Sequence, residues 1–276
     1  MVHDFLKYKS NIYSQNGEDG IIEQIFKLIG TETKLCCEFG AWDGIHLSNV
    51  RNLILNGWSG IVIEGDKDRY KQLAINYQNN EKVFCINEYI DTEHKLLTNL
   101  LRDHLFSNLD SMDFLSIDVD GLDYDIFETL DFQPRIICIE VNAGHDPKSS
   151  NRIARETAKN NIGQPLAVFT ELANNKGYEL MCYNGNAFFG RKDVLKKYTI
   201  DGLSSEIAYK NFLDVLTKQE KEWLWQVNEG WVEPHYKFRN PFLRPNELHI
   251  NYRNIMKLKA RYSAIYLKAL FARFTR

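Results

Sequence analysis

An acidic loop that contains glycine is the part of the chain best suited to hold a cofactor. Between a short apolar run and a helical pattern, the chain reads Cys37-Glu38-Phe39-Gly40-Ala41-Trp42-Asp43-Gly44. Open α/β sheets bind nucleoside-like groups where a strand ends in such a loop and continues into a helix. The spacing G-x-x-x-G lacks the close-approach glycine of a dinucleotide loop, and the acids would repel a diphosphate. The loop therefore favours a cofactor with a cationic end.

A second acid lies at the end of the next apolar run. That run is Gly60-Ile61-Val62-Ile63, and it is followed by Glu64-Gly65-Asp66. An acid at this position can accept hydrogen bonds from both ribose hydroxyls of a cofactor. S-adenosylmethionine combines a ribose with a cationic amino-acid end, so we expect it to be the cofactor.

Two further groups of polar residues follow later apolar runs. One begins at Ser116 and holds four acids among residues 118–125, and the other reads Glu140-Val141-Asn142-Ala143-Gly144-His145-Asp146. Ligands bind beyond the carboxyl ends of the strands in such sheets, so both groups should face the crevice that contains Glu38 and Glu64. Several carboxylates in one cleft repel each other, and a bound cation relieves that repulsion.

These side chains predict catalytic and metal-binding residues. Asp118, Glu140 and Asn142 offer the hard oxygen ligands that Mg²⁺ or Mn²⁺ prefers. We expect Asp118, Asp120 and His145 to be catalytic, since a carboxylate or an imidazole can take a proton from a hydroxyl group. In the alternative interpretation, the acids at positions 120, 123 and 125 cap the following helix, and His145 is a solvated loop residue.

A polar segment precedes the first helical pattern. It reads Ser14-Gln15-Asn16-Gly17-Glu18-Asp19-Gly20. One interpretation is a capped helix start, signalled by Asn16 and by Asp19 three residues later. The other is a lid over the methionine end of the cofactor.

Alternating strands and helices must position these residues. Apolar runs predict strands over 34–39, 60–63, 83–86, 114–117 and 135–141, and a hairpin of 178–183 with 187–190. Helical periodicity predicts helices over 18–29, 47–56, 68–77, 92–105, 124–130 and 165–176. Repeated strand–helix units imply a mostly parallel sheet covered on both faces. We predict an α/β protein with the Rossmann-like class I methyltransferase fold and a mostly parallel seven-stranded sheet.

The domain organisation follows from a change of pattern near residue 200. We predict an S-adenosylmethionine-binding domain over residues 1–200 and a helical, aromatic-rich extension over 201–276, with Trp223, Trp225 and Trp231 in its core. The tail from Lys257 is basic and amphipathic and contains no acid. We expect it to pack on its own domain or on a second copy of the chain, which leaves a homodimer open, rather than on a membrane.

Composition limits the function classes. The 276 residues carry a formal net charge of -3, which gives no electrostatic footprint for nucleic acid. The five cysteines form no C-x-x-C pair and lie mostly in apolar runs, as reduced cysteines do. The chain shows no signal-peptide core and no stretch as long as a membrane span, so we expect a cytoplasmic protein.

Several of these motifs resemble the FkbM-like family of S-adenosylmethionine-dependent methyltransferases. The segments concerned are Tyr13–Gly20, Glu38–Gly44, Ile63–Asp66 and Ser116–Gly121, in that order along the chain. The resemblance covers about the first 190 residues. It implies O-methylation of a sugar or a phosphorus-bearing group, as in bacterial capsule polysaccharide pathways, with a small molecule or glycan precursor as the acceptor.

The resemblance also implies roles for matching residues. Glu38, Gly40 and Asp43 would line the methionine end, Glu64 would bind the ribose, and Asp66 would lie near the adenosine. Asp118 would lie between cofactor and acceptor. The complete predicted set of cofactor-binding residues is Gln15, Glu38, Gly40, Asp43, Ser48, Glu64, Gly65, Asp66 and Asp118.

Three other classes fit parts of the sequence. Asp118-Val119-Asp120 is a D-x-D motif, which could hold Mn²⁺ with a sugar nucleotide in a metal-dependent glycosyltransferase. A nicotinamide dehydrogenase fits the fold but lacks its glycine fingerprint. A non-catalytic scaffold could retain the cofactor pocket and use its aromatic extension as a binding surface.

Overall fold

The fold consists of strands and helices that alternate along the chain. The computed structural model describes residues 3–90, 97–104, 109–119, 121–155 and 163–221. The strands are β1 (Leu35–Phe39), β2 (Ser59–Ile63), β3 (Val83–Ile86), β4 (Phe114–Ile117), β5 (Ile136–Glu140), β6 (Tyr178–Tyr183) and β7 (Asn186–Arg191). The α-helices are α1 (Glu18–Ile29), α2 (Arg51–Leu55), α3 (Lys67–Tyr77), α4 (Leu97–Asp103), α5 (Asp123–Thr129), α7 (Leu166–Asn175), α8 (Lys192–Lys197) and α9 (Ser205–Val215). Two short 3₁₀ helices, η1 (Phe5–Tyr8) and η2 (Leu109–Ser111), complete the described elements.

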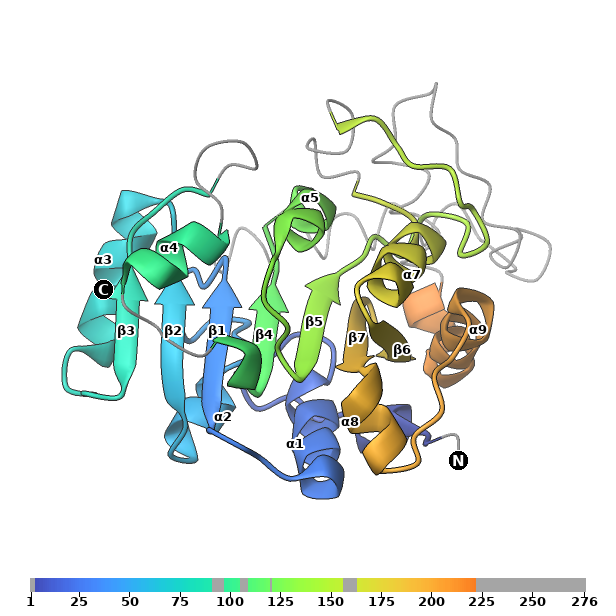
Figure 1. The fold of residues 1–276 in the computed structure, drawn as a ribbon, viewed down its shortest axis with the longest axis horizontal. Coiled ribbons are helices and arrows are strands. Elements are labelled where there is room, and N and C mark those ends of the chain that lie inside the picture. The colour runs from blue at the N-terminus through green and yellow to red at the C-terminus, as the bar shows by residue number, and fades with distance from the viewer. Residues whose placement is uncertain (1–2, 91–96, 105–108, 120, 156–162, 222–276) are drawn as a thin grey trace. The chain divides into compact units, whose positions relative to one another are not determined.

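The strands form one seven-stranded sheet in the order β3-β2-β1-β4-β5-β7-β6. Neighbours from β3 to β5 pair in parallel, whereas β7 is antiparallel to both β5 and β6. Helices cover both faces (Figure 1). This arrangement is the Rossmann-like class I methyltransferase fold, and it confirms the predicted parallel sheet with a terminal hairpin.

Buried apolar residues explain why these segments form these elements. β4 and the first four residues of β5 are buried throughout, as expected for central parallel strands covered on both faces. In α1, Ile21, Ile22, Ile25 and Ile29 recur at helical spacing and are all at most 1% exposed. The predicted bounds of α1, β3 and β4 agree with the structure.

Two local predictions were wrong. The helix predicted over 47–56 is only α2 (Arg51–Leu55), because Ser48 and Asn49 donate hydrogen bonds to the Glu38 side chain and take no part in the helix. The N-cap of α1 is Gly17, with φ 99°, and not Asn16. Asn16 instead donates its N–H to the Glu18 carboxylate.

The chain divides into two compact units, Met1–Leu216 and Thr217–Arg276. The first unit includes α9, whose Tyr209 and Phe212 rings contact the Tyr183 ring of β6. The predicted domain boundary at residue 200 stays a prediction. The three tryptophans and the basic tail predicted for the extension lie outside the described residues. In the part of the chain that is described, no helix combines the length and apolarity needed to cross a bilayer.

Candidate cofactor and acceptor site

The predicted site residues gather at the carboxyl edge of the parallel strands. Phe39 pairs in register with both Ile63 and Ile117, so the chain leaves β1, β2 and β4 at the same level. The N–H of Gly40 donates to the Ile63 carbonyl at 3.1 Å, and that of Asp118 donates to the Phe39 carbonyl at 3.1 Å. The sheet therefore brings the Glu38, Glu64 and Asp118 segments together, as the sequence predicts.

Gly40 is required by the close approach of two strand ends. Its φ is 86°, and a Cβ atom added there would lie 1.8 Å from the backbone oxygen of Asp118. A side chain would therefore separate the ends of β1 and β4 as well as strain the backbone. In this structure Gly40 keeps the cofactor loop against Asp118, and its contact with a cofactor stays a prediction.

Glu64 is fixed by backbone amides. One carboxylate oxygen accepts from Trp42 N–H at 2.8 Å and the other from Asp66 N–H at 2.8 Å, and the residue is 6% exposed. Each oxygen retains a further lone pair that can accept a hydroxyl. The carboxylate is thus held at the end of β2, and its rotamer is set before any ligand arrives.

Glu38 organises the segment that follows the loop. Its two oxygens accept from the Ser48 hydroxyl and from Asn49 N–H, both at 2.6 Å, and the residue is 4% exposed. Burial raises the pKa of Glu38 from 4.5 to about 8, and the nearby acids Asp118 and Asp19 add to the shift. The side chain therefore holds a proton near neutral pH in the ligand-free protein, and a cation placed beside it would favour the loss of that proton.

The raised pKa of Glu38 predicts that stability falls as the pH rises. The unfolded carboxyl loses its proton near 4.5 and the folded one near 8, so ionisation costs free energy across this window. We expect Glu38→Gln to flatten the fall in the free energy of unfolding between about pH 4.5 and 8, measured by denaturant titration at each pH. Glu23→Gln, which removes an exposed acid of α1, is the control and should leave the slope unchanged. An equal slope in the wild type and Glu38→Gln would contradict the shift.

The remaining cofactor-loop residues have local partners. Asp43 accepts from the N–H groups of Ile45 and His46 at 3.0 and 2.7 Å. Asp66 is the N-cap of α3 and accepts from the Asp68 and Arg69 amides. These hydrogen bonds lower the pKa of Asp66, and the bond from the Arg69 N–H makes the largest contribution. Both carboxylates therefore shape turns in the ligand-free chain.

Gly65 and Gln15, two predicted cofactor-binding residues, have different surroundings. A Cβ atom at Gly65 would come within 2.5 Å of the Tyr89 ring, which is 67% exposed. Gln15 is exposed, and its carbonyl accepts from the Asn11 side chain at 2.8 Å. No motif in the sequence marks Tyr89 as a neighbour of Gly65, because a lone aromatic after a strand carries no signal of its own.

The acids after β4 and β5 form a cluster. Asp118, Asp123 and Glu140 each have a carboxylate oxygen within 4.8 Å of the others. Asp123 is buried, and its oxygens accept from the Val119 and Gly121 amides at 2.9 Å. The third ligand predicted from the sequence is Asn142 and not Asp123. The Asn142 side-chain oxygen accepts from Gly144 N–H at 2.8 Å, and its metal role stays a prediction.

The alternative interpretation fits Asp125 but not His145, since Asp125 lies in the first turn of α5, where an acid favours the helix start. His145 is 2% exposed, so the solvated interpretation of this loop histidine is wrong. Asp125 pairs with Arg152 at 3.1 Å, and the Arg152 guanidinium lies 4.5 Å from the centre of the Tyr124 ring. Asp120, which the D-x-D interpretation needs, lies outside the described residues.

Comparisons with known proteins give low-identity similarities. No protein-family model matches the chain, and no curated protein matches it. The METTL16 MTase domain aligns at 16% identity with a TM-score of 0.41. The match spans 63% of this chain and 66% of that domain, which is just under two thirds of its length. An O-methyltransferase from Bacillus cereus in complex with SAH aligns at 14% identity, over 67% of this chain and 83% of that one, with a TM-score of 0.41. A TehB-like SAM-dependent methyltransferase from Corynebacterium glutamicum aligns at 12% identity, over 68% of this chain and 92% of that one, with a TM-score of 0.41. The fold assignment rests on the strand order and register of this chain.

Proposed function

We propose that this chain is an S-adenosylmethionine-dependent methyltransferase. The observation that carries the proposal is the buried Glu64 carboxylate, held by two backbone amides at the end of β2 beside the acidic loop that follows β1. In this class of sheet, that position is suited to the ribose hydroxyls of a nucleoside cofactor. The acidic residues nearby suit the sulfonium and ammonium charges of S-adenosylmethionine.

The proposed reaction is transfer of the methyl group to an oxygen. The acceptor oxygen forms a bond to the methyl carbon while the bond from that carbon to sulfur breaks, and S-adenosylhomocysteine leaves with the electron pair. The acceptor proton goes to a base, for which Asp118 is our first candidate because it follows β4 beside the cofactor loop. We infer from the FkbM-like motifs that the acceptor is a sugar or a phosphorus-bearing group of a bacterial capsule polysaccharide precursor.

The donor set at the ends of β4 and β5 fits a divalent cation. Asp118 and Glu140 have carboxylate oxygens within 4.8 Å of each other, and Glu140 is exposed. The Asp123 oxygens already accept backbone N–H groups, so they are the weaker third ligand. Mg²⁺ or Mn²⁺ bound there would lower the pKa of an acceptor hydroxyl. Asp118 and Glu140 would hold the ion, and Asp118 would remain beside the acceptor.

Ligand titration separates the proposed function from its alternatives. We expect calorimetry to show binding of S-adenosylhomocysteine, but not of NAD or a sugar nucleotide. Incubation with S-adenosylmethionine labelled in the methyl group and envelope precursor fractions should then yield a labelled product. Binding of a sugar nucleotide alone would support the glycosyltransferase class. Binding of S-adenosylhomocysteine without turnover on any acceptor would support a scaffold.

Glu64→Ala should weaken the binding of S-adenosylhomocysteine by about tenfold or more, because hydrogen bonds to a charged group contribute about 1.5–3 kcal/mol each. The measurement is the dissociation constant by calorimetry, with thermal unfolding recorded in parallel because Glu64 also holds two loop amides. Asp68→Ala is the matched control, since it removes an exposed acid of the first turn of α3. A dissociation constant that does not change in Glu64→Ala would exclude this residue from the site.

A further inference from the structure

Asp19 has one carboxylate oxygen that is saturated with donors and one that is not. Its Oδ2 accepts from the N–H groups of Ile12, Tyr13 and Ser14 at 2.7–2.8 Å and from the Ser14 hydroxyl at 2.8 Å. Its Oδ1 is buried and has no hydrogen-bond partner among the described residues, and Asp19 as a whole is 2% exposed. A buried acceptor without a partner costs free energy, which a bound donor would recover.

Arg51 has an unused donor of the complementary kind. Its Nε is buried, and within the described part of the chain it has no hydrogen-bond partner. The guanidinium carbon lies 4.8 Å from the centre of the Tyr77 ring and 6.0 Å from that of Tyr13. The stacking on these two rings orients the guanidinium and leaves Nε–H to donate to an anion.

The residues that carry the two orphan atoms share neighbours in the structure. Tyr13 connects them, because its N–H donates to Asp19 while its ring faces Arg51. Ser48 accepts from Arg51 N–H at 3.0 Å and donates to Glu38 at 2.6 Å. The charge of Asp19 also raises the pKa of Glu38. An acceptor and a donor therefore both belong to residues linked to Glu38, which we expect to line the methionine end of the cofactor.

We infer that Asp19 and Arg51 bind the zwitterionic amino-acid group of the cofactor. Asp19 Oδ1 accepts from the α-ammonium, and Arg51 Nε–H donates to the α-carboxylate. This inference rests on the proposed function. It gives the polar segment before α1 a specific task, since the backbone amides of residues 12–14 fix the Asp19 carboxylate and leave one oxygen for the ligand.

Three ligands that differ only at the amino-acid end test the inference. S-adenosylhomocysteine carries both charged groups, its decarboxylated analogue carries the ammonium alone, and 5′-methylthioadenosine carries neither. The protein variants are Asp19→Asn and Arg51→Met. Asparagine can keep its oxygen toward the backbone amides and places an NH₂ group at the Oδ1 position. Methionine keeps an apolar stem against the two tyrosine rings and removes the donor.

The expected results form a pattern that general damage cannot reproduce. Asp19→Asn should lower the affinity for S-adenosylhomocysteine and for its decarboxylated analogue by about tenfold or more, because a charge-assisted hydrogen bond is lost. The dissociation constant of 5′-methylthioadenosine should stay within about twofold of the wild-type value. Arg51→Met should lower only the affinity for S-adenosylhomocysteine, the one ligand of the three that carries the α-carboxylate. Ser14→Ala is the control, because it loosens the same loop without removing Oδ1, and the ratio of the affinities should not change.

Two results would overturn the inference. In the first, the variants lose affinity for all three ligands equally, which would assign Asp19 and Arg51 a structural role. In the second, the affinities do not change, which would mean that water satisfies Oδ1 and Nε. A wild-type protein that binds methylthioadenosine and S-adenosylhomocysteine equally would also overturn the amino-acid subsite while the proposed function survives. A wild-type protein that binds none of the three ligands would refute the proposed function itself.

Discussion

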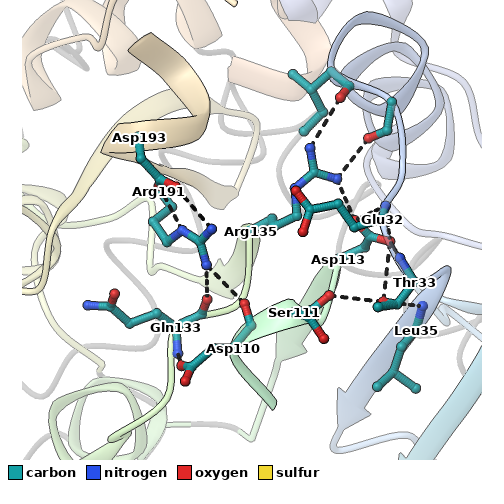
Figure 2. A network of polar contacts seen from close by, with 12 residues as sticks. Glu32, Thr33, Leu35, Asp110, Ser111, Asp113, Gln133, Arg135, Arg191 and Asp193 are labelled. Carbon is teal, nitrogen blue, oxygen red and sulfur yellow. Dashed lines mark hydrogen bonds and ion pairs between the residues drawn. The ribbon is translucent and has the colours of Figure 1, made fainter. Parts of the chain in front are cut away.

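Asp113→Ala should lower the free energy of unfolding by about 3–5 kcal/mol, because it removes the buried partner of the Arg135 guanidinium and leaves only the half-exposed Glu32 as an ion-pair partner. Asp113 is 0% exposed and accepts from the N–H groups of Glu32, Thr33 and Lys34 and from Arg135. Arg135 is 2% exposed and also donates to the carbonyls of residues 29 and 30 at the end of α1. Figure 2 shows this network between the start of β1 and the loops before β4 and β5. The measurement is denaturant unfolding.

The same figure contains the matched control. Arg191 pairs with Asp193, whose side chain is 65% exposed, and it also donates to the carbonyls of residues 110 and 133. An exposed pair contributes only about 0–1 kcal/mol, so Asp193→Ala should change stability little. A second test is the double variant Asp113→Ala with Arg135→Met, which removes both charges. Its loss in the free energy of unfolding should be smaller than the sum of the losses in the two single variants. A loss below about 1 kcal/mol in Asp113→Ala would contradict the buried ion pair as a stabilising element.

Asp118→Asn should reduce methyl transfer by about 10²–10⁴-fold, which is the usual contribution of a positioned general base. The amide keeps the size of the side chain but cannot take the acceptor proton. Initial rates with labelled S-adenosylmethionine measure the loss, and the affinity for S-adenosylhomocysteine should change far less. Glu171→Gln, an exposed acid of α7, is the charge-matched control. An unchanged rate in Asp118→Asn would exclude Asp118 as the base.

Removal of divalent ions decides whether Asp118 acts with a metal. If Asp118 and Glu140 hold Mg²⁺ or Mn²⁺, exhaustive chelation should slow the wild type by orders of magnitude and spare cofactor affinity. Either ion should restore the rate, since both are hard cations that suit carboxylate ligands. Full activity in protein shown by mass spectrometry to be metal-free would leave Asp118 as a base without a metal.

The sequence predicts the sheet well because its signal is local. Short apolar runs such as Phe114–Ile117 are buried on both faces, and the residues that follow them must lie at one edge of a parallel sheet. The gathering of Glu38, Glu64 and Asp118 could therefore be predicted from strand ends alone. The bounds of α1 could be predicted for a similar reason, since four isoleucines mark its buried face.

The rest depends on contacts between distant segments. The start of α2 was misplaced because the competing partner of Ser48 and Asn49 is Glu38, in another element. The close approach of Gly40 to Asp118 and the pairing of Asp113 with Arg135 likewise join separate parts of the chain. Asp19 is an ordinary helix-start acid in the sequence, and only the three-dimensional contacts distinguish its two oxygens.

Both ends of α1 are tied to residues that the ribosome makes much later. At its start, the Glu18 side chain accepts from Asn184 and Asn186, 166 and 168 positions further along the chain. At its end, the loop of residues 32–34 donates to Asp113, about 80 positions away. The first α-helix in the sequence therefore cannot complete its contacts until the β6–β7 hairpin has emerged. Hydrogen exchange in α1 should accordingly require the opening of the whole sheet, and a nascent chain that ends before β6 should leave this apolar helix available to chaperones.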